Sequence, residues 1–257
     1  MTSVSLAEGH VTIALPTSTP GTRREVLLVC GLVSSLLYVA MNVVSPLVWR
    51  EYSSVSQTVS ELSAIGAPTR AIWLPMAFLY TALVTVFGWG VREAAGSSRA
   101  LRAVGDLVMV YGLLGLVWPF APMHLRPALA AGGGMMTDTI HIALGIVTVL
   151  LMLLAIGFGA TAFGRRFRVY SIATLVVLVV FGALTAVEAP AIGSNQPTPL
   201  IGVWERTNIA AFLLWVIVLS CMLLLGRRAR PRATQSADTP CVQSRPREGA
   251  SARHVGG

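Results

Sequence analysis

Two histidines and an aspartate lie near the ends of apolar segments, where their side chains could bind a metal ion. Asp138 and His141 are three residues apart, so a helix would place both on one face. His124 follows the preceding apolar segment and could approach from a neighbouring helix end. Two imidazoles and a carboxylate with one open position are a common way to hold catalytic zinc. The pattern predicts a divalent metal site, zinc for example, at His124, Asp138 and His141.

A further carboxylate, Glu188, ends the fifth apolar segment. Beside a metal-bound water it could act as a general base, which would make the protein a metal-dependent membrane hydrolase acting at the outer leaflet. The sequence contains no HExxH, GxSxG or CxxC motif that would strengthen this interpretation. Whether the protein is an enzyme is therefore an open question at this point.

Two other interpretations fit the same polar residues. In the first, they line an outward-facing pocket for a small molecule or ion. The candidate lining residues are Glu61, His124, Asp138, His141, Glu188, Glu205 and Arg206. In the second, they are structural: Asp138 caps its helix or pairs with His141 or Arg126, and Glu205 lies at a helix start, where a carboxylate suits the dipole.

Six apolar segments must position these side chains. They span residues 26–46, 72–91, 104–121, 139–160, 169–189 and 208–226. Each is long enough to cross a bilayer, whose core of about 30 Å takes about 20 helical residues. The 257-residue chain is 54% hydrophobic and 12% charged, and its mean hydropathy is +0.72. This composition predicts an all-α polytopic membrane protein with six transmembrane helices and excludes a soluble nucleic-acid-binding protein, despite the net charge of +8.

The arginines predict the orientation in the membrane. All 19 basic residues are arginine. The gaps after the first, third and fifth segments hold only Arg50, Arg70, Arg126 and Arg206. The other arginines lie before the first segment or after the second, fourth and sixth. The positive-inside rule places the arginine-rich side in the cytoplasm. We therefore expect both termini in the cytoplasm and a multi-pass protein of the cell membrane.

The membrane domain is predicted to span residues 26–226. The polar N-terminal segment 1–25 and the Arg-, Pro- and Ser-rich tail 227–257 hold too few apolar residues to form a core, so we expect both to be disordered. The first apolar segment is too long for a typical cleaved signal, and we expect it to be retained. The basic cluster at 227–232 predicts attraction to anionic lipid headgroups, although a plain stop-transfer anchor explains the same residues.

Residues 47–71 form the longest gap on the outer side. Its apolar residues recur at helical spacing: Val55, Val59, Leu62 and Ile65. They predict a short amphipathic helix that ends at Gly66 and Pro68. Within the segments, small residues such as Gly112 predict a closely packed bundle. Asp106 follows Arg102 by four residues, which predicts an ion pair within one helix or, alternatively, a proton-relay carboxylate of a transporter.

The stretch Ser-Glu-Leu-Ser-Ala-Ile-Gly-Ala-Pro-Thr-Arg at 60–70, directly before an apolar segment, resembles the corresponding loop of the six-span membrane family DUF998. The family also tends to carry prolines and a histidine after the third span and a histidine early in the fourth. The matching residues here are Pro119, Pro122, His124 and His141. Ser63 and Ala64 stand where a glycine is more usual. The resemblance covers about residues 26–226 and implies a six-helix fold with polar residues at its outer face.

The family has no assigned activity, so the resemblance adds none. The leading expectation is an integral membrane protein of unassigned activity with an outward-facing polar pocket at the ends of spans three to six. The alternatives are a metal-dependent hydrolase at the outer leaflet, a small-molecule transporter, and a structural or partner-binding membrane protein.

Overall fold

The computed structural model describes residues 20–228 and confirms the all-helical, six-span prediction. Six of its helices are long and apolar enough to cross a membrane. They are α1 (Pro20–Val48), α2 (Arg70–Ala94), α3 (Arg99–Leu114), α5 (Met136–Ala162), α6 (Arg165–Glu188) and α8 (Ile201–Arg228). Short helical turns lie between them: η1 (Ser60–Ser63), η2 (Trp118–Phe120), α4 (Arg126–Ala130) and α7 (Pro190–Gly193).

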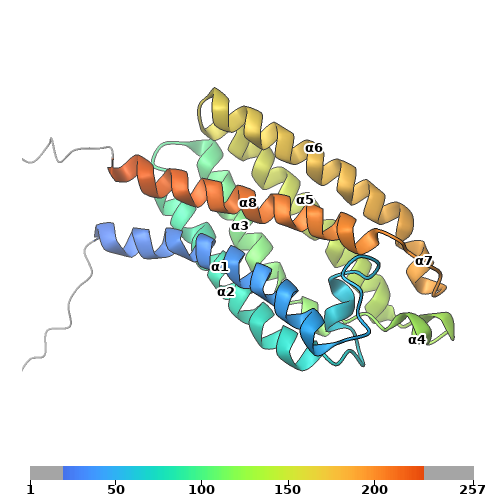
Figure 1. Ribbon diagram of the computed structural model, residues 1–257. Helices are drawn as coiled ribbons and strands as arrows, with labels where there is room; N and C mark the ends of the chain where they lie inside the picture. The colour runs from blue at the N-terminus through green and yellow to red at the C-terminus, as the bar shows by residue number, and fades with distance from the viewer. Residues whose placement is uncertain (1–19, 229–257) are drawn as a thin grey trace, which may run out of the picture.

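The six long helices pack in a closed ring. In order around the ring they are α1, α2, α3, α5, α6 and α8, and α8 packs back against α1. The start of α1 and the end of α8 lie at the same end of the bundle, which we call the terminal end (Figure 1). The segments containing η1, α4 and α7 lie at the opposite end, which we call the loop end (Figure 1).

The helices begin earlier than the apolar segments do. Helix α1 starts at Pro20, so residues 20–25, which we expected to be disordered, are helical. Proline suits the first turn of a helix, and Arg23 is held by an ion pair with Glu93 of α2 at 3.1 Å. The remainder of the N-terminal segment and the tail from 229 onward, with its predicted lipid contacts, lie outside the described residues. Helix α8 starts at Ile201, which places Glu205 and Arg206 inside it.

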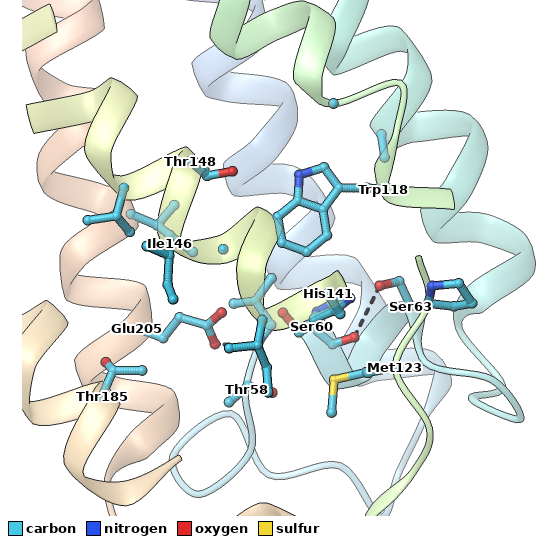
Figure 2. Close-up of a pocket in the computed structure, with 18 of the residues that line it drawn as sticks. Thr58, Ser60, Ser63, Trp118, Met123, His141, Ile146, Thr148, Thr185 and Glu205 are labelled. Carbon is cyan, nitrogen blue, oxygen red and sulfur yellow. Dashed lines mark hydrogen bonds between the residues drawn. The ribbon is translucent and has the colours of Figure 1, made fainter. Parts of the chain in front are cut away.

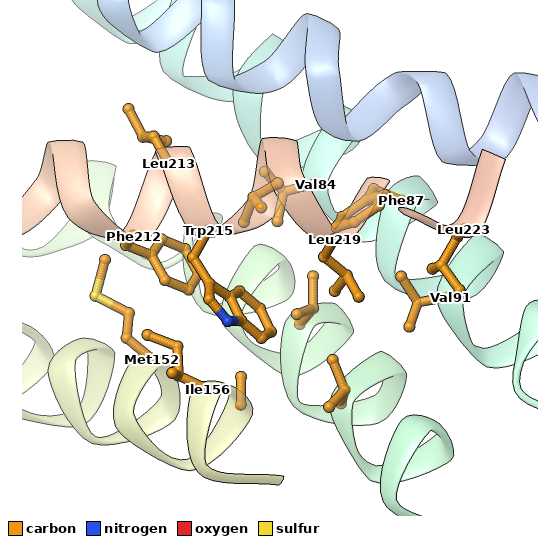
Figure 3. Close-up of a cluster of buried hydrophobic side chains, with 14 of the residues drawn as sticks. Val84, Phe87, Val91, Met152, Ile156, Phe212, Leu213, Trp215, Leu219 and Leu223 are labelled. Carbon is orange, nitrogen blue, oxygen red and sulfur yellow. The ribbon is translucent and has the colours of Figure 1, made fainter. Parts of the chain in front are cut away.

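The terminal half of the bundle is filled by a hydrophobic core. Phe87, Phe212, Trp215 and Leu219 are all at most 1% exposed and pack together between the helices (Figure 3). The Trp215 indole also donates a hydrogen bond to Ser171 Oγ at 3.0 Å, which satisfies its one polar atom. This half of the ring is closed by close-packed side chains.

Glycines on α3 let α2 approach closely, as the sequence predicted. A Cβ on Gly112 would lie 2.8 Å from the Thr85 nitrogen, and a Cβ on Gly105 would lie 2.7 Å from the Arg92 nitrogen. This approach brings Arg92 of α2 to Asp106, and the two form an ion pair. The predicted pair of Asp106 with Arg102 is therefore replaced by a pair between helices, because the neighbouring helix supplies the nearer guanidinium.

We expect Gly112→Ala to lower the free energy of unfolding by about 1–3 kcal/mol, because the new methyl group overlaps Thr85. Gly157→Ala is the matched control: nothing lies within 4 Å of its Cβ position. Alanine there favours the helix by about 1 kcal/mol. Thermal unfolding of the purified variants in detergent measures the difference. Equal midpoints for the two variants would contradict the close approach of α2 and α3.

Candidate functional site

The connection between α1 and α2, residues 49–69, is organised around one buried carboxylate. Glu61 is 0% exposed. Its Oε2 accepts hydrogen bonds from the Thr58 backbone N–H at 2.8 Å and from Thr58 Oγ1 at 3.0 Å, and its Oε1 accepts one from Gln57 Nε2 at 3.1 Å. These bonds draw the chain into turns and the short η1, where the predicted amphipathic helix is absent. Four apolar residues were expected on the buried face of that helix. Val59 and Leu62 are buried, and Val55 and Ile65 are exposed.

Arg126 joins Glu61 from the connection between α3 and α5. The guanidinium donates from Nε to Glu61 Oε1 at 2.7 Å and from Nη2 to Oε2 at 3.0 Å, a two-pronged ion pair. It also donates to the Ser56 carbonyl at 3.0 Å and to Thr198 Oγ1, which lies between α6 and α8, at 2.8 Å. One arginine thus ties all three connections of the loop end together.

The pKa of Glu61 reflects this environment. Burial alone would raise it, but the hydrogen bonds and charge of Arg126, with the donors Thr58 and Gln57, outweigh burial and hold the pKa below its ordinary value. The carboxylate is therefore ionised, as its pairing with Arg126 requires.

Helix α8 supplies a second attachment for the first connection. Arg206 donates to the carbonyls of Ser54 at 2.9 Å and Gln57 at 3.0 Å, and it also donates to the Tyr52 hydroxyl. Burial raises the pKa of Tyr52 to about 12, with Arg206 opposing the rise, so the phenol stays protonated. Glu205, the preceding residue, accepts a hydrogen bond from the Val59 N–H at 2.6 Å. Adjacent residues of α8 therefore hold the same loop.

The three residues of the predicted metal site are placed differently from the expectation. Asp138 accepts hydrogen bonds from the His124 backbone N–H at 2.7 Å and the Met135 N–H at 2.8 Å, and it meets His124 Nδ1 at 2.9 Å. His141 instead directs its Nδ1 to the Ala121 carbonyl at 2.8 Å. Within residues 20–228 no three His, Cys, Asp or Glu side chains form a group that could hold a metal. The aspartate is committed to the start of α5 and to His124.

His141 retains one ring nitrogen without a partner. Because a carbonyl can only accept, Nδ1 carries the proton and Nε2 is left with a free lone pair. The ring is 8% exposed, packs edge-on to Trp118 with centroids 4.6 Å apart, and its buried Nε2 has no hydrogen-bond partner. A buried acceptor without a donor is costly, so this atom is a candidate contact for a hydrogen-bond donor.

A cavity of about 750 Å³ lies beneath the loop-end connections. Most of its lining is apolar, and the side chains around it come from several helices: His141 and Thr148 from α5, Thr185 from α6 and Glu205 from α8 (Figure 2). The hydroxyl of Thr148, like His141 Nε2, is buried without a hydrogen-bond partner. Two tyrosines, Tyr80 and Tyr111, also line it and share a hydrogen bond of 2.8 Å.

Of the seven predicted pocket residues, Asp138, His141 and Glu205 line this cavity. The other four serve the architecture of the loop end. Glu61 and Arg206 hold the first connection, and His124 binds Asp138. Glu188 accepts hydrogen bonds from Trp204 Nε1 at 3.0 Å and from the Leu200 N–H at 3.3 Å.

Sequence reasoning did not place Thr148, Tyr80 or Asn208 in the pocket, although all three line it. A signal existed for Thr148: it lies seven residues after His141, which is two turns along the same face of α5. Asn208 had a similar signal, because it lies three residues after Glu205 on the same face of α8, whereas the place of Tyr80 depends on how α2 is turned in the ring.

The fold and this site define a polytopic helical membrane protein with an apolar cavity under ion-paired connections. Residues 32–222 match the model of a family described as "Protein of unknown function (DUF998)", and the chain belongs to that family. No curated protein and no solved structure matches the chain.

We expect Arg126→Met to destabilise the protein by about 3–5 kcal/mol, because it leaves the Glu61 carboxylate buried and unpaired. The control is Arg92→Met, which breaks the ion pair with Asp106 at the terminal end; both side chains there are about half exposed, so its loss should cost at most about 1 kcal/mol. Thermal unfolding and limited proteolysis of the connections measure the contrast. Similar losses in both variants would contradict the role given to Arg126.

The Glu61–Arg126 pair also predicts that the stability of the fold depends on pH. The pKa of folded Glu61 lies below its value in the unfolded chain, about 4.3. Ionisation of Glu61 therefore stabilises the fold above the pKa of the unfolded chain. This stabilisation is lost as the pH falls through the pKa of the folded protein. The stability advantage of the wild type over Glu61→Gln should be largest near neutral pH and shrink below about pH 4. Unfolding midpoints of the two proteins, compared across this range, test it; parallel curves would exclude a lowered pKa.

Proposed function

We propose that this protein binds a small amphipathic molecule in the loop-end cavity, with the cavity facing outward from the cell membrane. The observation that carries the proposal is a mostly apolar cavity of about 750 Å³ containing a buried acceptor without a donor, His141 Nε2. Ligand sites have volumes of about 300–1,000 Å³ and combine apolar walls with a few polar groups that orient the ligand.

The polar groups favour a ligand that donates hydrogen bonds. His141 Nε2 can only accept in its neutral form, and Glu205 and Asp138 add carboxylates to the same cavity. Arg70 also lines the cavity, and its guanidinium donates to the Ser63 carbonyl. The guanidinium next to Glu205 in sequence, Arg206, is directed to the first connection and binds its carbonyls. A carboxylate in apolar surroundings gains most from a cationic partner. An amine on an apolar body is therefore the preferred ligand chemistry, and a hydroxyl is the next.

The outward orientation rests on the distribution of charge. The arginines concentrate in the gaps that belong to the terminal end, which the positive-inside rule assigns to the cytoplasm. Of the four arginines in the loop-end gaps, Arg126, Arg206 and Arg70 donate to groups within the protein, Arg70 to the Ser63 carbonyl. Their presence at this end therefore has structural explanations.

The other functions considered from the sequence have less support. A metal-dependent hydrolase needs His124, Asp138 and His141 around one ion, and His141 is turned to Ala121 instead. A transporter needs a route to the terminal end, which in this conformation is filled by the core around Trp215. A purely structural role accounts for Glu61 and Arg206 and leaves the His141 acceptor unexplained.

Three probes with the same chain and different heads test the proposal: dodecylamine, dodecanol and dodecanoate. With the protein in nanodiscs, saturating dodecylamine should raise the unfolding midpoint by about 5–10 °C. Dodecanol should raise it less, and dodecanoate should have no effect, because its carboxylate faces Glu205. Glu205→Gln and His141→Phe should each abolish most of the amine effect.

Glu188→Gln is the matched control. This carboxylate lies near the same end of the bundle but binds Trp204 and does not line the cavity, so the variant should keep the response to dodecylamine. Equal effects of the three probes, or an amine effect that survives in Glu205→Gln and His141→Phe, would indicate general amphiphile insertion and overturn the proposal.

A further inference from the structure

One side of the cavity is formed by residues that also lie on the outer surface of the bundle. On α5, Ile142 is 66% exposed, Ile146 59% and Leu150 52%, yet all three line the cavity. Ala186 on α6 and Ala189, directly after the end of α6, are likewise exposed and line it. Figure 2 shows Ile146 beside the cavity on the α5 side. These residues lie in membrane-spanning segments, so the surface they expose faces lipid.

Helix α6 is less closely packed along the part that borders this side of the cavity. Between Phe167 and Leu178 the helix buries a residue every turn, whereas no residue from Val179 to Glu188 is buried. The terminal half of the α5–α6 pair is closed by α8, where Trp215 fills the space in front of Gly159. In the loop half, Gly145 and Gly182 line the cavity, and the nearest neighbours of a Cβ there would be Trp118 at 4.0 Å and Asn208 of α8 at 3.1 Å.

The two ends of the cavity are closed. At the loop end, Arg126 ties the three connections together, and the Ile65 N–H donates to the Met123 carbonyl at 2.8 Å. Toward the terminal end lies the core around Phe212 and Trp215 (Figure 3), which begins at Tyr80 and Met152, two residues that also line the cavity. Within the described residues, the side between α5 and α6 carries the largest group of exposed cavity-lining residues; on α2, Phe78 is 42% exposed and also lines the cavity.

We propose that the gap between α5 and α6 is a lateral portal through which a single-chain amphiphile enters from the bilayer. This inference rests on the proposed binding function and adds the source of the ligand. The donating head group binds His141 Nε2 and Glu205, while the alkyl chain passes between Ile146 and Ala186 toward the lipid. The unpaired, nine-tenths buried imidazole gives the head group a fixed place, and the exposed apolar residues give the chain a continuous apolar path.

The test uses a long-chain alkylamine with a diazirine next to the amine, dissolved in the vesicles that hold the protein. After brief irradiation, mass spectrometry should locate adducts on cavity-lining residues of α5 and α8. Ala186→Trp, which places an indole in the portal, should slow this labelling by at least about tenfold. Ala183→Trp is the control: Ala183 is exposed on the same helix but does not line the cavity, and labelling should continue. Ala189→Trp provides a second blocked portal if the first variant does not fold.

The outcomes separate the two proposals. If dodecylamine fails to stabilise the wild type at all, the binding function is wrong, and the portal with it. If dodecylamine stabilises the wild type through Glu205 but both portal variants are labelled as fast as Ala183→Trp, the ligand enters by another route and the portal is wrong. Fast labelling of the wild type with loss in both portal variants supports lateral entry.

Discussion

The loop end of this protein depends on the burial of one ionised pair, Glu61 with Arg126. A fully buried carboxylate is tolerated only with compensating donors, and here Arg126, Thr58 and Gln57 supply them. Because Arg126 also reaches the Ser56 carbonyl and Thr198, the same pair fixes the three connections relative to each other. The cover over the cavity thus combines these polar contacts with a small hydrophobic cluster in which Ala64, Met123 and Ile192 join the same three connections.

The two halves of the helix ring differ in what occupies their centre. In the terminal half, large side chains such as Trp215 occupy the centre and glycines make room for them. In the loop half, the centre is left to a cavity, which Gly145 lines beside Trp118. Which half of the ring is filled depends on where the aromatic side chains of α8 point, because α8 borders both halves.

The six spans and the close glycine packing could be predicted because each depends on a local pattern of the sequence. Length and hydropathy define a span, and a glycine row defines a face for close approach. The partners of the polar residues could not be predicted in the same way. Asp138 and His141 share a helix face, but their hydrogen bonds go to His124 and Ala121, whose positions depend on the fold of the connection before α5. Asp106 pairs with Arg92 for the same reason: the neighbour across a helix interface is closer than the neighbour along the helix.

The buried pair also limits which substitutions this chain can accept. Substitution of Glu61 or Arg126 alone leaves one buried charge unpaired. Such a protein is destabilised, and selection for folding removes it. The two positions lie 65 residues apart in the chain, yet they are expected to change together or not at all. Where the pair is retained, the lengths of the connections around it are constrained as well, because each must bring its own donor or acceptor to the same guanidinium.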